Sequence, residues 1–457
     1  MGPHPNITFG AGATETTMTA IGVALLLTAA VLMLVLPRKW VIVPFLLFTF
    51  LTPLGQQFYI GGLHVFADRI VILCGCLRFL PRSSSARTAF VGGFTSIDKA
   101  FMACCLCQAV AFSLLYHVGG AVVNQIGFLW DALGGYFLVR CLIRDVNDIR
   151  RIAKVFVLIA VILAGCMLYE HYKLTNIFAV LMGGKIVPDI RAGKVRCRGP
   201  FAQEIIASVF GGTLIPFFLW LWTASKARIA AVLGLISSVI ITLTASSSTG
   251  IAAAAVGVGT LCLWPLRRHV RRMLWGLVAV IVGLALVMKA PVWFILARID
   301  FVGGSAGWDR ANLINQCVRH FSSWWLIGTA DNDTWGYFTW DLCNQFVDEA
   351  VHGGLATVVL FLVLITRSFR RIGVEQNTAR SRKDKWLLWA IGCILCAHVA
   401  GFVGISYFDQ IRDWWYVTLA MIPAATLSVR TSNSAKRPKA VLVLDPLPAV
   451  CVAHSQT

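Results

Sequence analysis

Long apolar runs recur along the whole chain and constrain its fold more than any other feature. They lie at about 18–36, 40–54, 63–80, 97–116, 124–143, 152–169, 201–222, 229–245, 250–265, 273–290, 342–366, 386–406 and 412–429. A helix needs about 20 apolar residues to cross a bilayer, whereas the strands of a membrane barrel alternate apolar and polar residues. The sequence therefore predicts an all-α polytopic membrane protein with about 12–13 transmembrane helices.

The composition supports this class. Of 457 residues, 58% are hydrophobic and 13% are charged, against about 45–50% and about 25% in soluble domains. The formal net charge of +19 is attributed to basic residues that flank spans on the cytoplasmic side, so no nucleic-acid partner is expected. Most of the fourteen cysteines lie in apolar runs, where they are interpreted as small buried residues and not as metal ligands.

The positions of Lys and Arg predict the topology. The first apolar run is followed by "PRKW", which favours an N-terminus outside. Alternating the sides from there puts nearly every strongly basic connection, and the C-terminus, in the cytoplasm. Residues 1–429 are expected to form a single transmembrane domain, and residues 430–457 a disordered cytoplasmic tail.

The same alternation places two long loops outside, at about 170–200 and about 291–341. The first contains "KIVPDIRAGKVRCRGPF", with Arg196 and Arg198 just before a span, and so departs from the positive-inside rule. An anionic ligand explains this departure, since the planar guanidinium donates in pairs to phosphate. The alternative is one miscounted span, which would invert every later loop. Glu204, about one turn into the following span, is expected to pair with one of these arginines.

The second outer loop combines polar and aromatic residues. Its segment "DRANLINQCVRHF" predicts a short amphipathic helix on the outer surface, with Arg310, Arg319 and His320 at the boundary between water and lipid. The tryptophans of this loop, Trp335 among them, either anchor the protein at the interface or stack on sugar rings.

The order of the motifs resembles the O-antigen ligase and O-antigen polymerase superfamily. The motifs are "RCRGPF" before a span, "LTASSSTG", "WWLIGTADN", and "NQFV" followed by "GGL", within residues 190–365. The resemblance implies a GT-C-like membrane glycosyltransferase that needs no nucleotide sugar, metal or other cofactor. Such an enzyme transfers a glycan from undecaprenyl pyrophosphate to a hydroxyl of a glycan or lipid acceptor, in O-antigen or exopolysaccharide assembly. The resemblance also implies the inner membrane and its periplasmic face.

The resemblance carries over to particular residues. Arg196, Arg198 and Arg310 would bind the pyrophosphate, and the further expected substrate contacts are Arg319, His320, Trp335 and Asn344. The ligases carry a His where this chain has Cys343, and a thiol is a poor proton acceptor. Either no base is needed, or another group serves. The candidate catalytic residues are Glu349, Asp341 and His352.

Two other functions remain open from the sequence. A transporter or flippase of lipid-linked or anionic solutes would explain charged residues inside spans. A noncatalytic scaffold for polysaccharide assembly would explain the loss of the histidine.

Overall fold

The computed structural model describes residues 16–61, 63–79, 90–224, 227–298, 301 and 306–435. The described chain is helical apart from two small hairpins. The helices are α1 Ala20–Val35, α2 Arg38–Leu51, α3 Ala67–Leu77, α5 Ser96–Tyr116, α6 Gly119–Leu129, η2 Trp130–Gly134, α7 Gly135–Leu142, α8 Val146–Lys173, α9 Ile177–Met182, α10 Glu204–Ala224, α11 Arg228–Thr244, α12 Ser248–Cys262, η3 Trp264–His269, α13 Val270–Val287, η4 Val292–Arg298, α14 Gly307–Arg319, α15 Phe321–Trp324, η5 Asn332–Trp335, α16 Gln345–Thr378, α17 Arg382–Phe402 and α18 Gln410–Ala435. The strands are β1 Gln57–Ile60 with β2 Leu63–Phe66, and β3 Asp189–Arg191 with β4 Lys194–Arg196, both pairs antiparallel.

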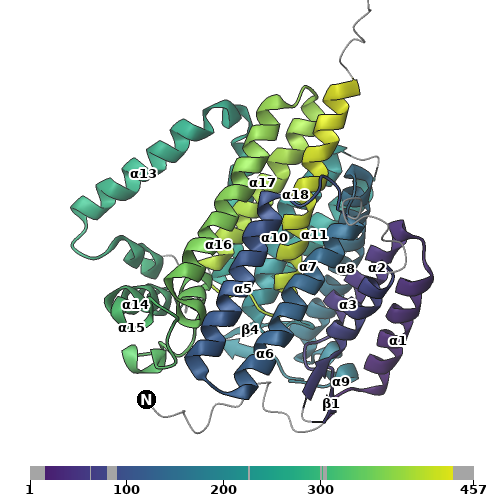
Figure 1. Ribbon diagram of the computed structural model, residues 1–457, viewed down its shortest axis with the longest axis horizontal. Helices are drawn as coiled ribbons and strands as arrows, with labels where there is room; N and C mark the ends of the chain where they lie inside the picture. The colour runs from purple at the N-terminus through teal and green to yellow at the C-terminus, as the bar shows by residue number, and fades with distance from the viewer. Residues whose placement is uncertain are drawn as a thin grey trace, which may run out of the picture.

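The long helices pack side by side into one bundle (Figure 1). Helix α10 contacts α11, α12 and α17, while α16 packs along α5. Large aromatic side chains fill the core, including Trp220 and Trp414, which are 1% and 0% exposed. Apolar residues cover most of each helix because nearly every face meets another helix or lipid. The expected all-α, membrane-type architecture is confirmed.

Fewer helices are long enough to span than the sequence predicts. Seven described helices have the length and apolar composition to cross a bilayer. The run at 63–80 instead forms strand β2 and the 11-residue helix α3, which at 1.5 Å per residue is too short to cross alone. Helices α1, α11 and α12 have 16, 17 and 15 residues. An apolar run alone does not show how many of its residues become helical.

The two long loops lie at the same end of the bundle. The hairpin β3–β4, helix α9 and the helices α14 and α15 all gather there, and α18 ends at the opposite end (Figure 1). This arrangement agrees with the predicted alternation of sides. The predicted amphipathic helix is α14, which buries Ala311, Leu313 and Cys317 and exposes Val318.

One domain boundary shifts. Helix α18 continues to Ala435, so the first residues of the predicted tail, 430–435, are helical and not disordered. The rest of that tail, 436–457, lies outside the described residues.

Helix α13 stands apart from the bundle (Figure 1). None of its residues is buried, although its span is strongly apolar. Lipid tails are as apolar as its Leu and Val side chains. In a membrane, lipid therefore covers the apolar surface of this helix, and the helix needs no protein partner there.

Candidate functional site

The motif "RGPF" is fixed by residues from two other elements. The carboxylate of Glu170, near the end of α8, accepts hydrogen bonds from the backbone N–H groups of Arg198 at 3.2 Å and Gly199 at 2.9 Å. The side-chain amide of Asn176 donates to the Gly199 carbonyl at 2.7 Å. Gly199 has φ +58°, a conformation that favours glycine. These contacts hold the chain as it turns from the hairpin into α10, and the sequence analysis did not identify Glu170 or Asn176.

The two arginines of this motif have different partners. The guanidinium of Arg196 lies 3.6 Å from the carboxylate of Glu204, which confirms the predicted pairing of Glu204 with one of them. The guanidinium of Arg198 donates to the Lys185 carbonyl at 2.7 Å. Both side chains are partly buried at the loop-bearing end of the bundle.

The turn in "LTASSSTG" supports the same hairpin. The Ser246 hydroxyl donates to the Val195 carbonyl in β4 at 3.1 Å, and the Thr244 carbonyl accepts the Cys197 N–H at 3.0 Å. The turn between α11 and α12 therefore helps to position the arginine-bearing strand.

Arg310 is the most deeply buried of the predicted phosphate-binding cations. It lies in α14, is 9% exposed, and donates from Nε to the Gly404 carbonyl at 3.0 Å. Among the described residues, no carboxylate forms an ion pair with its guanidinium. Burial lowers the pKa of Arg310, and Arg191 and Arg196 lower it further, while Cys343 and Asp309 oppose this fall. A buried cation without an ion pair favours an anion beside it.

Cys343 does not replace the histidine of the ligases as a base. Burial raises the pKa of its thiol to about 12, and the neighbouring carboxylate of Asp341 contributes to the rise. The thiol is therefore neutral near pH 7 and cannot accept a proton. Asp341 itself lies beside this thiol.

The connection between α17 and α18, residues 403–409, joins the parts of the site. Its Val403 carbonyl accepts from the Asn344 amide at 3.1 Å, and the adjacent Gly404 carbonyl accepts from Arg310. Farther along, the Asp409 carboxylate accepts the Ala202 N–H at 2.8 Å. One short segment thus contacts the entry to α10, the helix α14 and the start of α16.

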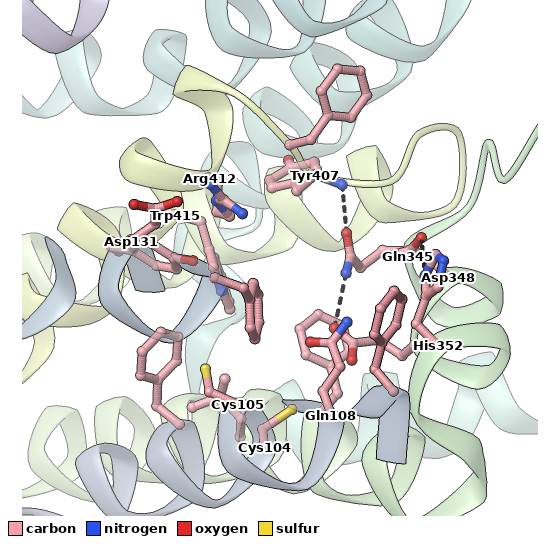
Figure 2. Close-up of a pocket in the computed structure, with 18 of the residues that line it drawn as sticks. Cys104, Cys105, Gln108, Asp131, Gln345, Asp348, His352, Tyr407, Arg412 and Trp415 are labelled. Carbon is pink, nitrogen blue, oxygen red and sulfur yellow. Dashed lines mark hydrogen bonds and ion pairs between the residues drawn. The ribbon is translucent and has the colours of Figure 1, made fainter. Parts of the chain in front are cut away.

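A cavity of about 480 Å³ opens beside the start of α16 (Figure 2). The predicted residues Glu349 and His352 line it, together with Asp348 and Gln345, which the sequence analysis did not identify. His352 Nδ1 lies 3.0 Å from Asp348 Oδ1, and Gln345 donates to Glu349 Oε1 at 2.9 Å. The backbone N–H of Tyr407 donates in turn to Gln345 (Figure 2).

The remaining predicted residues lie elsewhere or have structural contacts. Asn344 caps α16, accepting from the N–H groups of the next helical residues. His320 stacks on Trp335, with ring centroids 5.5 Å apart, and Trp335 is 6% exposed within a small second core. Arg319 is exposed on α14. None of these four residues lines the cavity.

No group of three or more His, Cys, Asp or Glu side chains in the described ranges is arranged to hold a metal ion. Comparison of the chain with known protein families and with curated proteins finds no match in either.

Proposed function

We propose that this protein is a membrane glycosyltransferase of the ligase or polymerase type, which transfers a glycan from a lipid pyrophosphate to a sugar hydroxyl. The observation that carries the proposal is Arg310. Its guanidinium is nine-tenths buried, is fixed to a backbone carbonyl, and has no ion pair with a carboxylate among the described residues. Leaving such a cation unpaired costs several kcal/mol, so a bound anion such as pyrophosphate compensates it.

Arg196 and Arg310 would act together on the leaving group. As the bond between the anomeric carbon and the pyrophosphate oxygen breaks, its electron pair passes to the pyrophosphate. Fixed cations in a site with little water stabilise this growing negative charge. Arg196 lies close enough to Arg310 to lower its pKa. This proximity supports a shared binding site for the two phosphates.

His352 is the best-placed proton acceptor for the attacking hydroxyl. Its Nδ1 is held by Asp348 at 3.0 Å, which leaves Nε2 to take the proton as the new glycosidic bond forms. The start of α16 links the cavity that His352 lines with the segment that binds Arg310. Asn344 donates a hydrogen bond to the Val403 carbonyl, and the neighbouring Gly404 carbonyl accepts from Arg310. Gln345, which follows Asn344 in the chain, lines the cavity.

The alternatives receive less support. A transporter of anionic solutes calls for free cations along a path through the membrane. Arg196, Arg198 and Arg310 lie in segments at the loop-bearing end, and the two arginines that line the cavity, Arg69 and Arg412, both have acidic neighbours. A scaffold without activity would have no use for a His–Asp pair on a cavity. The basic connections at the opposite end support a periplasmic position for the loop-bearing end, because basic connections favour the cytoplasmic side.

The proposal is tested by measuring the binding of undecaprenyl pyrophosphate to the purified full-length chain in lipid nanodiscs. Native mass spectrometry detects the bound lipid. Arg310→Ala should weaken binding at least about tenfold, because it removes a buried charge-assisted contact. Arg310→Lys keeps the charge without the planar fork, so an intermediate loss is expected. Arg319→Ala is the matched control, because Arg319 is exposed on the same helix.

Thermal unfolding of each variant separates lost binding from lost folding. Folded Arg310→Lys and Arg310→Ala proteins that bind the lipid as tightly as the wild type would refute the proposed site. Equal losses in Arg319→Ala would assign the binding to general surface charge.

A further inference from the structure

The cavity beside α16 is built from three kinds of side chain. Figure 2 shows Asp131 and Arg412 on one side, Gln345, Asp348 and His352 on the other, and Cys104, Cys105 and Gln108 of α5 along one wall. Aromatic rings, including Trp415 and Tyr416, complete the lining. Its volume of about 480 Å³ falls within the range of roughly 300–1,000 Å³ typical of small-molecule sites. Carboxylates and amides hydrogen-bond polar groups, and aromatic faces stack on C–H groups. The lining therefore suits a ring with polar groups at its edge and C–H groups on its faces.

Each basic side chain on this lining has acidic neighbours within the protein. Arg69 forms two hydrogen bonds of 2.9 Å with the carboxylate of Asp131. His352 is paired with Asp348. Arg412 lies within electrostatic reach of three acids, Asp131, Asp409 and Asp413. Glu349, in contrast, has no direct ion pair with any cation of this lining among the described residues.

Two buried acceptor atoms on this lining have no partner within the described structure. They are Oε2 of Glu349 and Oε1 of Gln125, on residues only 5% and 7% exposed. Glu349 Oε1, by contrast, is satisfied by Gln345. Buried acceptors are almost always hydrogen-bonded in folded proteins. The missing component is thus a hydrogen-bond partner, and a positively charged donor at Oε2 would also stabilise Glu349 as a carboxylate.

We propose that the cavity binds a sugar ring carrying a primary amine, with its ammonium group on Glu349 Oε2. Ring hydroxyls donate to acceptors such as Gln125 Oε1, and the ring faces stack on the aromatic walls. This inference rests on the proposed function, in which the ring is the acceptor and one of its hydroxyls meets His352. Acetylation of the amine removes its charge, so the cavity discriminates between a free amino sugar and its N-acetyl form.

Ligand binding without turnover tests this directly. The probes are methyl glucosaminide, methyl glucoside and methyl N-acetylglucosaminide, titrated onto the full-length chain in nanodiscs and followed by tryptophan fluorescence, to which Trp415 contributes from the lining. The glucosaminide should bind roughly tenfold more tightly than the other two, which is the effect of one charge-assisted hydrogen bond. Glu349→Gln should abolish that preference while weak binding of all three remains.

Glu375→Gln is the matched control, because Glu375 is also buried in α16, at 3% exposed, but pairs with Arg430 outside the cavity. It should keep the preference for the amine. Equal affinity for the three glycosides, or a preference that survives in folded Glu349→Gln protein, would overturn the inference.

This experiment needs neither the lipid donor nor catalysis, so its failure is separable from that of the proposed function. An amine preference without binding of undecaprenyl pyrophosphate would refute the transferase and leave the ligand class of the cavity standing. Pyrophosphate binding without an amine preference would refute only the inference.

Discussion

At the scale of single residues, Asp409 shows how burial changes the pKa of a carboxyl group. It lies in the connection between α17 and α18. Its side chain is 6% exposed, and one carboxylate oxygen accepts the Ala202 N–H at 2.8 Å. Burial raises the pKa of this carboxyl from 3.8 to about 7, although that hydrogen bond opposes the rise. Its backbone is left-handed, with φ +58°, a conformation that Asp and Asn tolerate better than most residues.

Asp409→Asn should reduce the dependence of stability on pH. A raised carboxyl pKa means that the folded state binds the proton more tightly than the unfolded state. The wild type therefore loses stability as pH rises from about 4 to about 7, by up to roughly 4 kcal/mol from this group. Asparagine keeps an acceptor for Ala202 and cannot ionise. The difference in Tm, variant minus wild type, should grow between pH 5 and pH 8 in nanodiscs, and a constant difference would contradict the assignment.

At the scale of elements, α16 changes direction where it carries the site. Gly354 interrupts the helix with φ +69° and ψ −172°, a conformation open essentially to glycine alone. The segment after α15 supplies partners for the interrupted backbone: Leu355 N–H donates to the Trp325 carbonyl, and Thr329 N–H to the Val351 carbonyl. The first part of α16, with Glu349 and His352, is thereby held against the segment that follows α15.

Gly354→Ala should destabilise the protein strongly. An added Cβ would lie 2.6 Å from the Leu326 carbonyl oxygen, and the backbone conformation itself costs about 1–3 kcal/mol for a residue other than glycine. Gly373→Ala in the same helix is the control, since its Cβ meets nothing within 4 Å, and alanine favours a helix by up to about 1 kcal/mol. Thermal unfolding should show a large drop in Tm for the first variant and none for the second. Similar Tm values for the Gly354→Ala and Gly373→Ala proteins would contradict the interruption of α16 at Gly354.

At the scale of the whole molecule, the even alternation of helices places both long loops on one face (Figure 1). The hairpin that carries Arg196, the helix that carries Arg310 and the start of α16 lie at this face, and the basic connections occupy the other face. Cys197, between Arg196 and Arg198, is fully buried, and burial raises its pKa to about 12. It is therefore a poor label for topology despite its position.

Ile190→Cys offers a better label, because Ile190 is 60% exposed on β3. In a chain whose other cysteines are replaced, a membrane-impermeant maleimide should label it on intact spheroplasts. Val374→Cys, at a 51% exposed position near the other end of α16, should be labelled only after lysis. The reverse pattern would invert the topology and place the arginine site in the cytoplasm.

The sequence by itself determined the membrane class, the order of the helices and the amphipathic helix α14. Apolar length, side-chain periodicity and Lys/Arg distribution are local properties, readable from neighbouring residues. They did not fix helix bounds, as the short α3 and the extended α18 show, because helix ends depend on local capping and packing.

Only the tertiary structure decided how the site is assembled. Arg310 meets Gly404 across 94 residues of sequence, and Ala202 meets Asp409 across 207. The cavity around the unpartnered oxygen of Glu349 likewise arises from α5, α6, α16 and α18 packing together. Such contacts depend on which helices are neighbours in space, and a single sequence leaves that choice open because one apolar helix face packs as well against lipid as against another helix.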